Sequence, residues 1–186
     1  SVITVVDDKA HYFPGASSFI IKMIADRASL KLLGIQVLGA GAVDKVVDIA
    51  VTGITCKATL SDLANMDLAY APPFSTAIHP FEHTLNVLMN KINGTFETFT
   101  PAEYAAGAAE GYKVVDGCLT PSIEGAPYVD LTKVEGLIEG LDKDEKILLV
   151  CNKGKRAYLL QNRMKYYGYT NTKVLEGGIT FSEVKA

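Results

Sequence analysis

The chain has 186 residues, which is enough for one large domain or two small ones. Its 48% hydrophobic content, 21% charged content and net charge of −3 are ordinary for a globular protein and exclude the basic surface typical of nucleic-acid binding. No apolar run approaches the roughly 18 residues that span a bilayer, and no signal peptide is recognisable at the N-terminus, so we expect no membrane association.

The first 93 residues open with strands. The run Val2–Val6 is β-branched and apolar, and it predicts the first strand. Phe19–Ile24 and Leu32–Leu38 predict a hairpin around the polar turn 26–31. From Asp44 to Thr55 the apolar period changes to that of a helix. An antiparallel sheet with helices, an α+β unit, is the expected result.

The rest of this half contains two further predicted helices and a proline-containing segment between them. Ser61 is expected to cap a short helix over 62–66. The segment Tyr70–Ser75 contains two prolines, which exclude regular helix. A last helix is predicted over Pro80–Ile92, ended by Asn93-Gly94. His79 and His83 stand four residues apart near its start, but without a third ligand they predict no metal site.

The second half, residues 94–186, alternates strands and helices, which predicts an α/β unit with a parallel sheet. The expected strands are Lys113–Val115, Tyr128–Leu131, Ile147–Val150 and Thr172–Leu175, and the expected helices are Leu131–Gly140 and Arg156–Tyr167. Functional sites in such sheets form at the carboxyl ends of the strands. We therefore expect two domains, 1–93 and 94–186, with a site at that edge of the second.

Three widely spaced cysteines, Cys56, Cys118 and Cys151, show no metal-ligand pairing and indicate a reducing compartment, so we expect a cytoplasmic protein. Cys56, at a predicted helix end, is expected to be inert packing. Cys151 differs because it stands between a buried strand and a helix N-terminus. Backbone N–H groups and the helix dipole there favour a thiolate, the reactive form of cysteine.

The type of reaction that Cys151 could perform is indicated by the segment Cys151-Asn152-Lys153-Gly154-Lys155-Arg156. It resembles the active loop of rhodanese-type sulfurtransferases, where Cys-x-x-Gly-x-Arg closes around a persulfide. Protein tyrosine phosphatases have a longer loop, which suits a tetrahedral phosphate. The resemblance implies that Cys151 and Arg156 are catalytic, and that Asn152, Lys153, Gly154 and Lys155 form the persulfide or anion loop. A structural cysteine at the end of a buried strand is the plainer alternative.

Three segments of the first half share a second resemblance: His11-Tyr12-Phe13-Pro14-Gly15-Ala16, Gly39-Ala40-Gly41-Ala42-Val43-Asp44-Lys45 and Asp67–Ser75. They resemble the C-terminal dimerisation domain of pyridine nucleotide-disulfide oxidoreductases, in the coenzyme A-disulfide reductase and NADH oxidase branch. In some members a rhodanese domain follows directly. The glycines at 39 and 41 do not complete a dinucleotide fingerprint, since Asp44 takes its last glycine position.

The second resemblance implies that the chain is the C-terminal part of an FAD- and NAD(P)H-dependent coenzyme A-disulfide or persulfide reductase. The cofactor domains would lie upstream, so we expect no cofactor in this chain itself. The expected partners are a second copy through residues 1–93, the upstream domains and small sulfur-containing substrates. Tyr12 and Tyr70 match positions that contribute to the partner subunit's substrate site in the family.

The rhodanese pattern departs from its usual form near residue 116. Asp116 is retained, Cys118 replaces the usual arginine and the usual histidine is absent. Cys118 is a candidate second thiol near Cys151, or a small apolar residue that fills the place of the arginine. These departures leave open a second interpretation: a non-catalytic dimerisation and docking module with a degenerate rhodanese domain.

Overall fold

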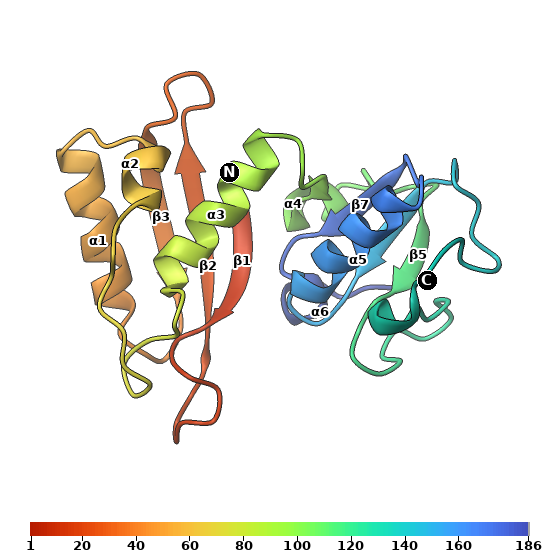
Figure 1. Ribbon diagram of the computed structural model, residues 1–186, viewed down its shortest axis with the longest axis horizontal. Coiled ribbons are helices and arrows are strands. Elements are labelled where there is room, and N and C mark those ends of the chain that lie inside the picture. The colour runs from red at the N-terminus through yellow and green to blue at the C-terminus, as the bar shows by residue number, and fades with distance from the viewer. Residues whose placement is uncertain (186) are drawn as a thin grey trace. The chain divides into compact units, whose positions relative to one another are not determined.

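The computed structural model describes residues 1–185. The chain divides into two compact units, Ser1–Asn93 and Gly94–Ala186, and each unit has its own sheet (Figure 1). Among the described residues, no helix is both long enough and apolar enough to cross a membrane.

The first unit is built on an antiparallel sheet in the order β1 (Val2–Asp7), β2 (Ser18–Ala25) and β3 (Leu32–Leu38). Burial alternates along β2, as expected for a strand with one covered face. The buried side chains of β2 are Phe19, Ile21 and Met23. The hairpin predicted from the sequence is confirmed.

Helices α1 (Val43–Thr55) and α3 (Pro80–Ile92) pack on this sheet. Helix α3 contacts β1 and β2, while α1 contacts β3 and α3. Both helices begin at the same end of the unit (Figure 1). A buried hydrogen bond of 2.7 Å between the hydroxyls of Thr4 and Thr84 joins β1 to α3.

The short helix α2 (Leu60–Ala64) begins earlier than the sequence predicted. Its cap is Thr59 rather than Ser61, because the Thr59 side chain accepts a hydrogen bond from the Asp62 N–H. The Asp62 carboxylate accepts in return from the Thr59 N–H, at 2.8 Å. This reciprocal capping box makes Thr59 the better start.

The second unit contains a parallel sheet in the order β4 (Thr98–Phe99), β7 (Thr172–Leu175), β6 (Ile147–Val150) and β5 (Lys113–Asp116). All four residues of β6 are buried. Helix α5 (Lys155–Tyr166) packs against β6 and β7. Parallel pairing brings the ends of β5, β6 and β7 to one edge, directly before Gly117, Cys151 and Glu176.

Three short elements were not anticipated: β4, α4 (Pro101–Ala105) and α6 (Gly178–Phe181). Each has two to five residues, which is too few to show a hydrophobic period. The start of α4 is nevertheless encoded locally, since Thr100 and Glu103 form a capping box there.

The strand over 128–131 and the helix over 131–140 were wrong predictions. The chain forms only an isolated bridge at Tyr128 and a single 3₁₀ turn, η1 (Leu131–Lys133). A distant residue supplies the reason: the Tyr169 hydroxyl accepts the Ile138 N–H at 2.8 Å and donates to the Leu141 carbonyl at 3.2 Å. The Ile138 N–H and the Leu141 carbonyl are therefore bonded to Tyr169 and not to backbone groups of a helix. The glycines at 136 and 140 also disfavour a helix here.

Candidate functional site

Cys151 lies directly after β6, and its side chain is 2% exposed. The loop that follows ends at Gly154, which caps α5 with a φ of 91°. This is the left-handed conformation, which glycine adopts without strain. Gly154 thus turns the chain sharply enough for α5 to start beside the sulfur.

Two backbone N–H groups donate hydrogen bonds to the Cys151 sulfur. They belong to Gly154, at 3.2 Å, and to Ala157, at 3.3 Å. Both stand at the start of a 12-residue helix, whose dipole also favours negative charge at this end. Ala157 lies outside the motif that the sequence singled out, and only its place in the first turn of α5 could have pointed to it.

The short helix α6 holds the other side of this loop. The Ile179 N–H donates to the Cys151 carbonyl at 3.1 Å, and the Thr180 N–H donates to the Asn152 carbonyl at 3.0 Å. Gly178 makes this approach possible, because a Cβ there would stand 1.9 Å from the Cys151 carbonyl oxygen. The loop carbonyls are thereby bonded to α6, away from the sulfur.

Arg156 does not donate to the sulfur in this structure. Its Nε donates to the Gly117 carbonyl at 3.3 Å, and its Nη2 lies 3.6 Å from a carboxylate oxygen of Asp130. Hydrogen bonds from the Thr132 backbone and hydroxyl, helped by Lys133 and Arg156, hold the pKa of Asp130 below its ordinary value against partial desolvation. Arg156 therefore ties α5 to the segments after β5 and before η1.

The remaining loop residues lie further out. Asn152 and Lys155 are exposed, and Lys153 is half-buried. Lys155 begins α5. The positive charges of Lys153 and Lys155 therefore lie on the outer side of the loop.

Asp116 organises the neighbouring turn after β5. Its carboxylate accepts backbone N–H groups from Cys118 at 2.8 Å, Ser122 at 2.6 Å and Ile123 at 2.9 Å. Burial raises the pKa of Asp116, but these hydrogen bonds lower it by more, so the net shift is downward. Asp116 is thus a fixed negative charge that shapes the turn.

Cys118 is buried beside that carboxylate. Burial, the hydrogen bond to Asp116 and the charge of Asp116 raise the pKa of its thiol to about 12. Cys118 follows β5 and Cys151 follows β6, and these strands pair in parallel, so both cysteines lie at the same edge of the sheet. All three cysteines are free thiols, and Cys56 is exposed, contrary to the packing role expected from the sequence.

Tyr12 and Tyr70 lie in the first unit on two exposed segments. Their side chains are 68% and 52% exposed. A backbone hydrogen bond from the Ala10 N–H to the Pro72 carbonyl, at 3.3 Å, joins the two segments. The two tyrosines are therefore displayed by neighbouring stretches of one surface.

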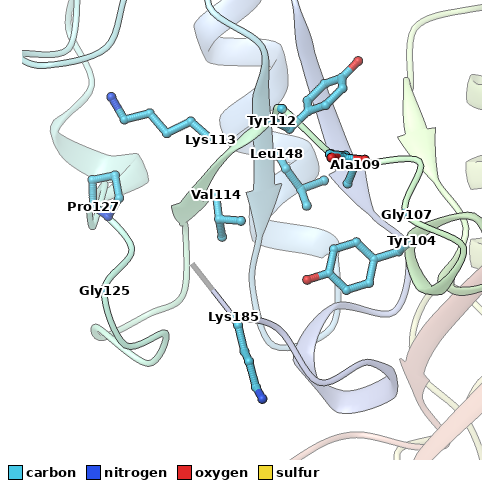
Figure 2. Close-up of a pocket in the computed structure, with 12 residues that line it drawn as sticks. Tyr104, Gly107, Ala109, Tyr112, Lys113, Val114, Gly125, Pro127, Leu148 and Lys185 are labelled. Carbon is cyan, nitrogen blue, oxygen red and sulfur yellow. The ribbon is translucent and has the colours of Figure 1, made fainter.

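A pocket of about 650 Å³ lies elsewhere on the second unit. Figure 2 shows Val114 and Leu148 on its strand side, with Tyr104, Tyr112 and Lys185 around it. No residue of the Cys151 loop is among those that line it.

The glycines at 39 and 41 do not form a dinucleotide-binding loop. A Cβ at Gly41 would stand 2.8 Å from a carboxylate oxygen of Asp8, and one at Gly39 would stand 2.4 Å from the Phe19 ring. These glycines pack on the protein itself and not around a phosphate. Within residues 1–185, no three His, Cys, Asp or Glu side chains gather closely enough to hold a metal ion.

The comparisons with known proteins agree with this architecture. The chain belongs to the rhodanese-like domain family, whose model matches residues 87–181. Residues 3–80 match the dimerisation domain of pyridine nucleotide-disulphide oxidoreductases. Both resemblances noted in the sequence are confirmed, as is the fold class of an α+β unit followed by an α/β unit.

Two solved structures are similar over nearly the whole chain. One is an NAD-dependent persulfide reductase from A. fulgidus, with 32% identity, a TM-score of 0.87 and coverage of 98% of this chain and 33% of that one. The other is the reduced Bacillus anthracis CoADR-RHD, with 28% identity, a TM-score of 0.86 and coverage of 97% and 33%.

Among curated proteins, the CoA-dependent NAD(P)H sulfur oxidoreductase of Pyrococcus furiosus is 39% identical over 72 residues, which are 39% of this chain and 16% of that protein. The coenzyme A disulfide reductase of Staphylococcus epidermidis is 34% identical over 71 residues, which are 38% and 16% of the two chains. The chain therefore spans less than a fifth of these relatives and a third of the two similar structures.

Proposed function

We propose that Cys151 carries sulfane sulfur as a persulfide. The observation that supports this most directly is the pair of backbone N–H groups, from Gly154 and Ala157, that donate to its sulfur. Such donors stabilise a sulfur anion as an oxyanion hole stabilises oxygen. The rhodanese-like family and the names of the two similar structures point to the same chemistry.

The transfer step balances without an added oxidant or reductant. The Cys151 thiolate attacks the outer sulfur of a persulfide or polysulfide donor, and a new S–S bond forms to Cys151. The S–S bond of the donor breaks, and its inner sulfur leaves as a thiolate. The proton on the outer sulfur passes to the leaving thiolate, and the negative charge then left on the Cys151 persulfide would be held by backbone N–H groups of Asn152 to Ala157, while Arg156 positions the start of α5.

We further propose that the intact protein is an FAD- and NAD(P)H-dependent coenzyme A-disulfide or persulfide reductase. The similarity to an NAD-dependent persulfide reductase and to coenzyme A disulfide reductases supports this. The cofactors would bind outside these residues, so no step in this chain runs through them. Tyr12 and Tyr70, both exposed, would reach the substrate site of a second copy.

Residues 1–93 would form the homodimer, in keeping with the dimerisation-domain family. Large exposed apolar side chains on this unit are consistent with an interface, among them Val51 on α1 and Leu33 and Leu38 on β3. Three free cysteines also favour a reducing compartment such as the cytoplasm.

The competing function is a dimerisation and docking module without sulfur transfer. Two observations favour it: Cys151 is almost fully buried, and Cys118 occupies the place of the usual arginine with a thiol that stays protonated at neutral pH. In that case the second unit would serve only as a scaffold.

A cyanolysis assay separates the two functions. The chain is incubated with coenzyme A persulfide or thiosulfate and then with cyanide, and thiocyanate is measured. We expect thiocyanate from the wild type and none above background from Cys151→Ser. Cys56→Ser is the matched control, because Cys56 is an exposed thiol outside the loop, and it should behave as the wild type. Equal thiocyanate from the wild type and Cys151→Ser would favour the docking module.

A further inference from the structure

A second pocket, of about 400 Å³, lies within the first unit. Its apolar walls come from Phe19, Val46, Pro73, Phe74 and Pro80. Its polar lining consists of Asp8, Lys9, Lys45 and His79. None of these residues belongs to the Cys151 loop, and neither Tyr12 nor Tyr70 lines the pocket.

The glycines of the Gly39-Ala40-Gly41 segment explain how this pocket forms. They lack a Cβ where one would collide with Phe19 or Asp8, so the chain passes close to both before α1 starts. Ala42, which lines the pocket, is the N-cap of α1 and provides no side-chain hydrogen bond to it. No side chain caps this 13-residue helix at the pocket, although the Val43 N–H donates to the Gly41 carbonyl at 2.9 Å and Asp44 stands in the first turn.

His79 adds a donor. It is only 4% exposed, and its Nδ1 accepts the Phe81 N–H at 3.2 Å. The proton of the neutral imidazole is therefore on Nε2, which has no hydrogen-bond partner among the described residues. Burial, with the nearby charge of Lys45, lowers the pKa of His79 to about 4, so this ring stays neutral. Nε2 is not among the fully buried polar atoms of the described residues, so this N–H is open to an acceptor that enters the pocket.

The charged side chains of the pocket favour a negatively charged ligand. Lys9 lies 3.4 Å from a carboxylate oxygen of Asp8, and the Ser17 N–H donates to the other oxygen at 2.7 Å. Asp8 is thus already neutralised within the protein. Lys45 forms no ion pair in the described part of the chain, so its positive charge is available to a ligand.

We propose that this pocket binds a small organic oxyanion, a phosphate ester or a carboxylate on a flat apolar body. The anionic group would be held by the Lys45 ammonium, the His79 Nε2–H and the N-terminus of α1. The apolar body would lie against Phe74, Phe19 and Pro73. The assignment is independent of sulfur transfer at Cys151, because it rests on the first unit alone.

Binding can be followed by NMR of the full chain, using the amides of residues 42–46 and the His79 ring. Phenyl phosphate and benzoate are the probes, and inorganic phosphate tests the apolar part of the site. We expect saturable shifts with phenyl phosphate or benzoate, and the tighter of the two identifies the anion. Inorganic phosphate should bind more weakly than phenyl phosphate, and higher salt should weaken all binding.

Lys45→Met keeps the aliphatic stem and removes the charge, and we expect it to weaken binding about tenfold. Lys57→Met is the matched control, since it makes the same change just beyond the opposite end of α1 and should leave binding unchanged. The proposal would be overturned if the chemical shifts showed no saturable change with the probe at about 10 mM. Equal weakening by the two variants, or inorganic phosphate binding as tightly as phenyl phosphate, would also overturn it.

Discussion

At the scale of single residues, the two cysteines of the second unit have opposite surroundings. The Cys151 sulfur faces two N–H donors, whereas the Cys118 thiol faces the Asp116 carboxylate. A thiol with a pKa near 12 is not a nucleophile at neutral pH. The role of Cys118 as a second thiol stays a prediction, and this environment counts against it.

Alkylation tests this contrast. At neutral pH, iodoacetamide should modify Cys56, which is exposed, and should leave Cys118 intact until the protein is unfolded. Peptide mass spectrometry gives the extent of modification at each cysteine. Modification of Cys118 at the rate of Cys56 in the folded protein would show that its thiol is neither buried nor protonated as described.

The neutral His79 predicts a pH dependence of stability. Because burial and Lys45 lower its pKa from 6.5 to about 4 on folding, the unfolded chain binds more protons between those values. The free energy of unfolding should therefore fall as the pH drops from about 6.5 towards 4. Urea unfolding of wild type and His79→Asn measures this, since asparagine can still cap α3 but does not titrate. An identical pH dependence in both proteins would show that His79 is not responsible.

At the scale of elements, the first unit was largely predictable, because its strands and longer helices carry clear local periods. The second unit was less predictable from its sequence. Around residue 138 the backbone bonds to Tyr169, which lies 31 residues further along the chain, and no local pattern reveals that. The candidate site was also only partly predictable. The position of Cys151 after a strand and before a helix was evident from the residues next to it in the sequence. The contacts of Arg156 with Asp130 and the bonds from α6 depend on tertiary structure.

Because α6 donates hydrogen bonds to the Cys151 loop, a small substitution at Gly178 should have a large effect on sulfur transfer and stability. Gly178→Ala places a Cβ against the Cys151 carbonyl and also strains a residue whose φ is 57°. We expect sulfur transfer to fall at least tenfold and the free energy of unfolding to fall by about 1–3 kcal/mol. Gly136→Ala is the control, because a Cβ added there would meet no other atom within 4 Å and the φ of Gly136 is not left-handed. If both variants behave as the wild type, the loop does not depend on α6.

At the scale of the whole molecule, the proposed dimer through residues 1–93 can be tested by analytical ultracentrifugation. We expect the wild type to sediment as a dimer at micromolar concentration. Val51→Lys, on the exposed face of α1, should shift it towards monomer. Leu137→Lys makes a similar change at an exposed residue of the second unit and should not. A monomeric wild type would contradict the proposal, and equal sedimentation of all three as dimers would exclude α1 from the interface.

The central claim is that Cys151 carries sulfur, and mass spectrometry of the full chain tests it most directly. After incubation with polysulfide, the peptide that contains Cys151 should gain the mass of one sulfur atom and lose it again on treatment with cyanide. The peptides of Cys56 and Cys118 should not follow this cycle. A Cys151 peptide that never gains sulfur, or added sulfur confined to Cys56, would contradict the account.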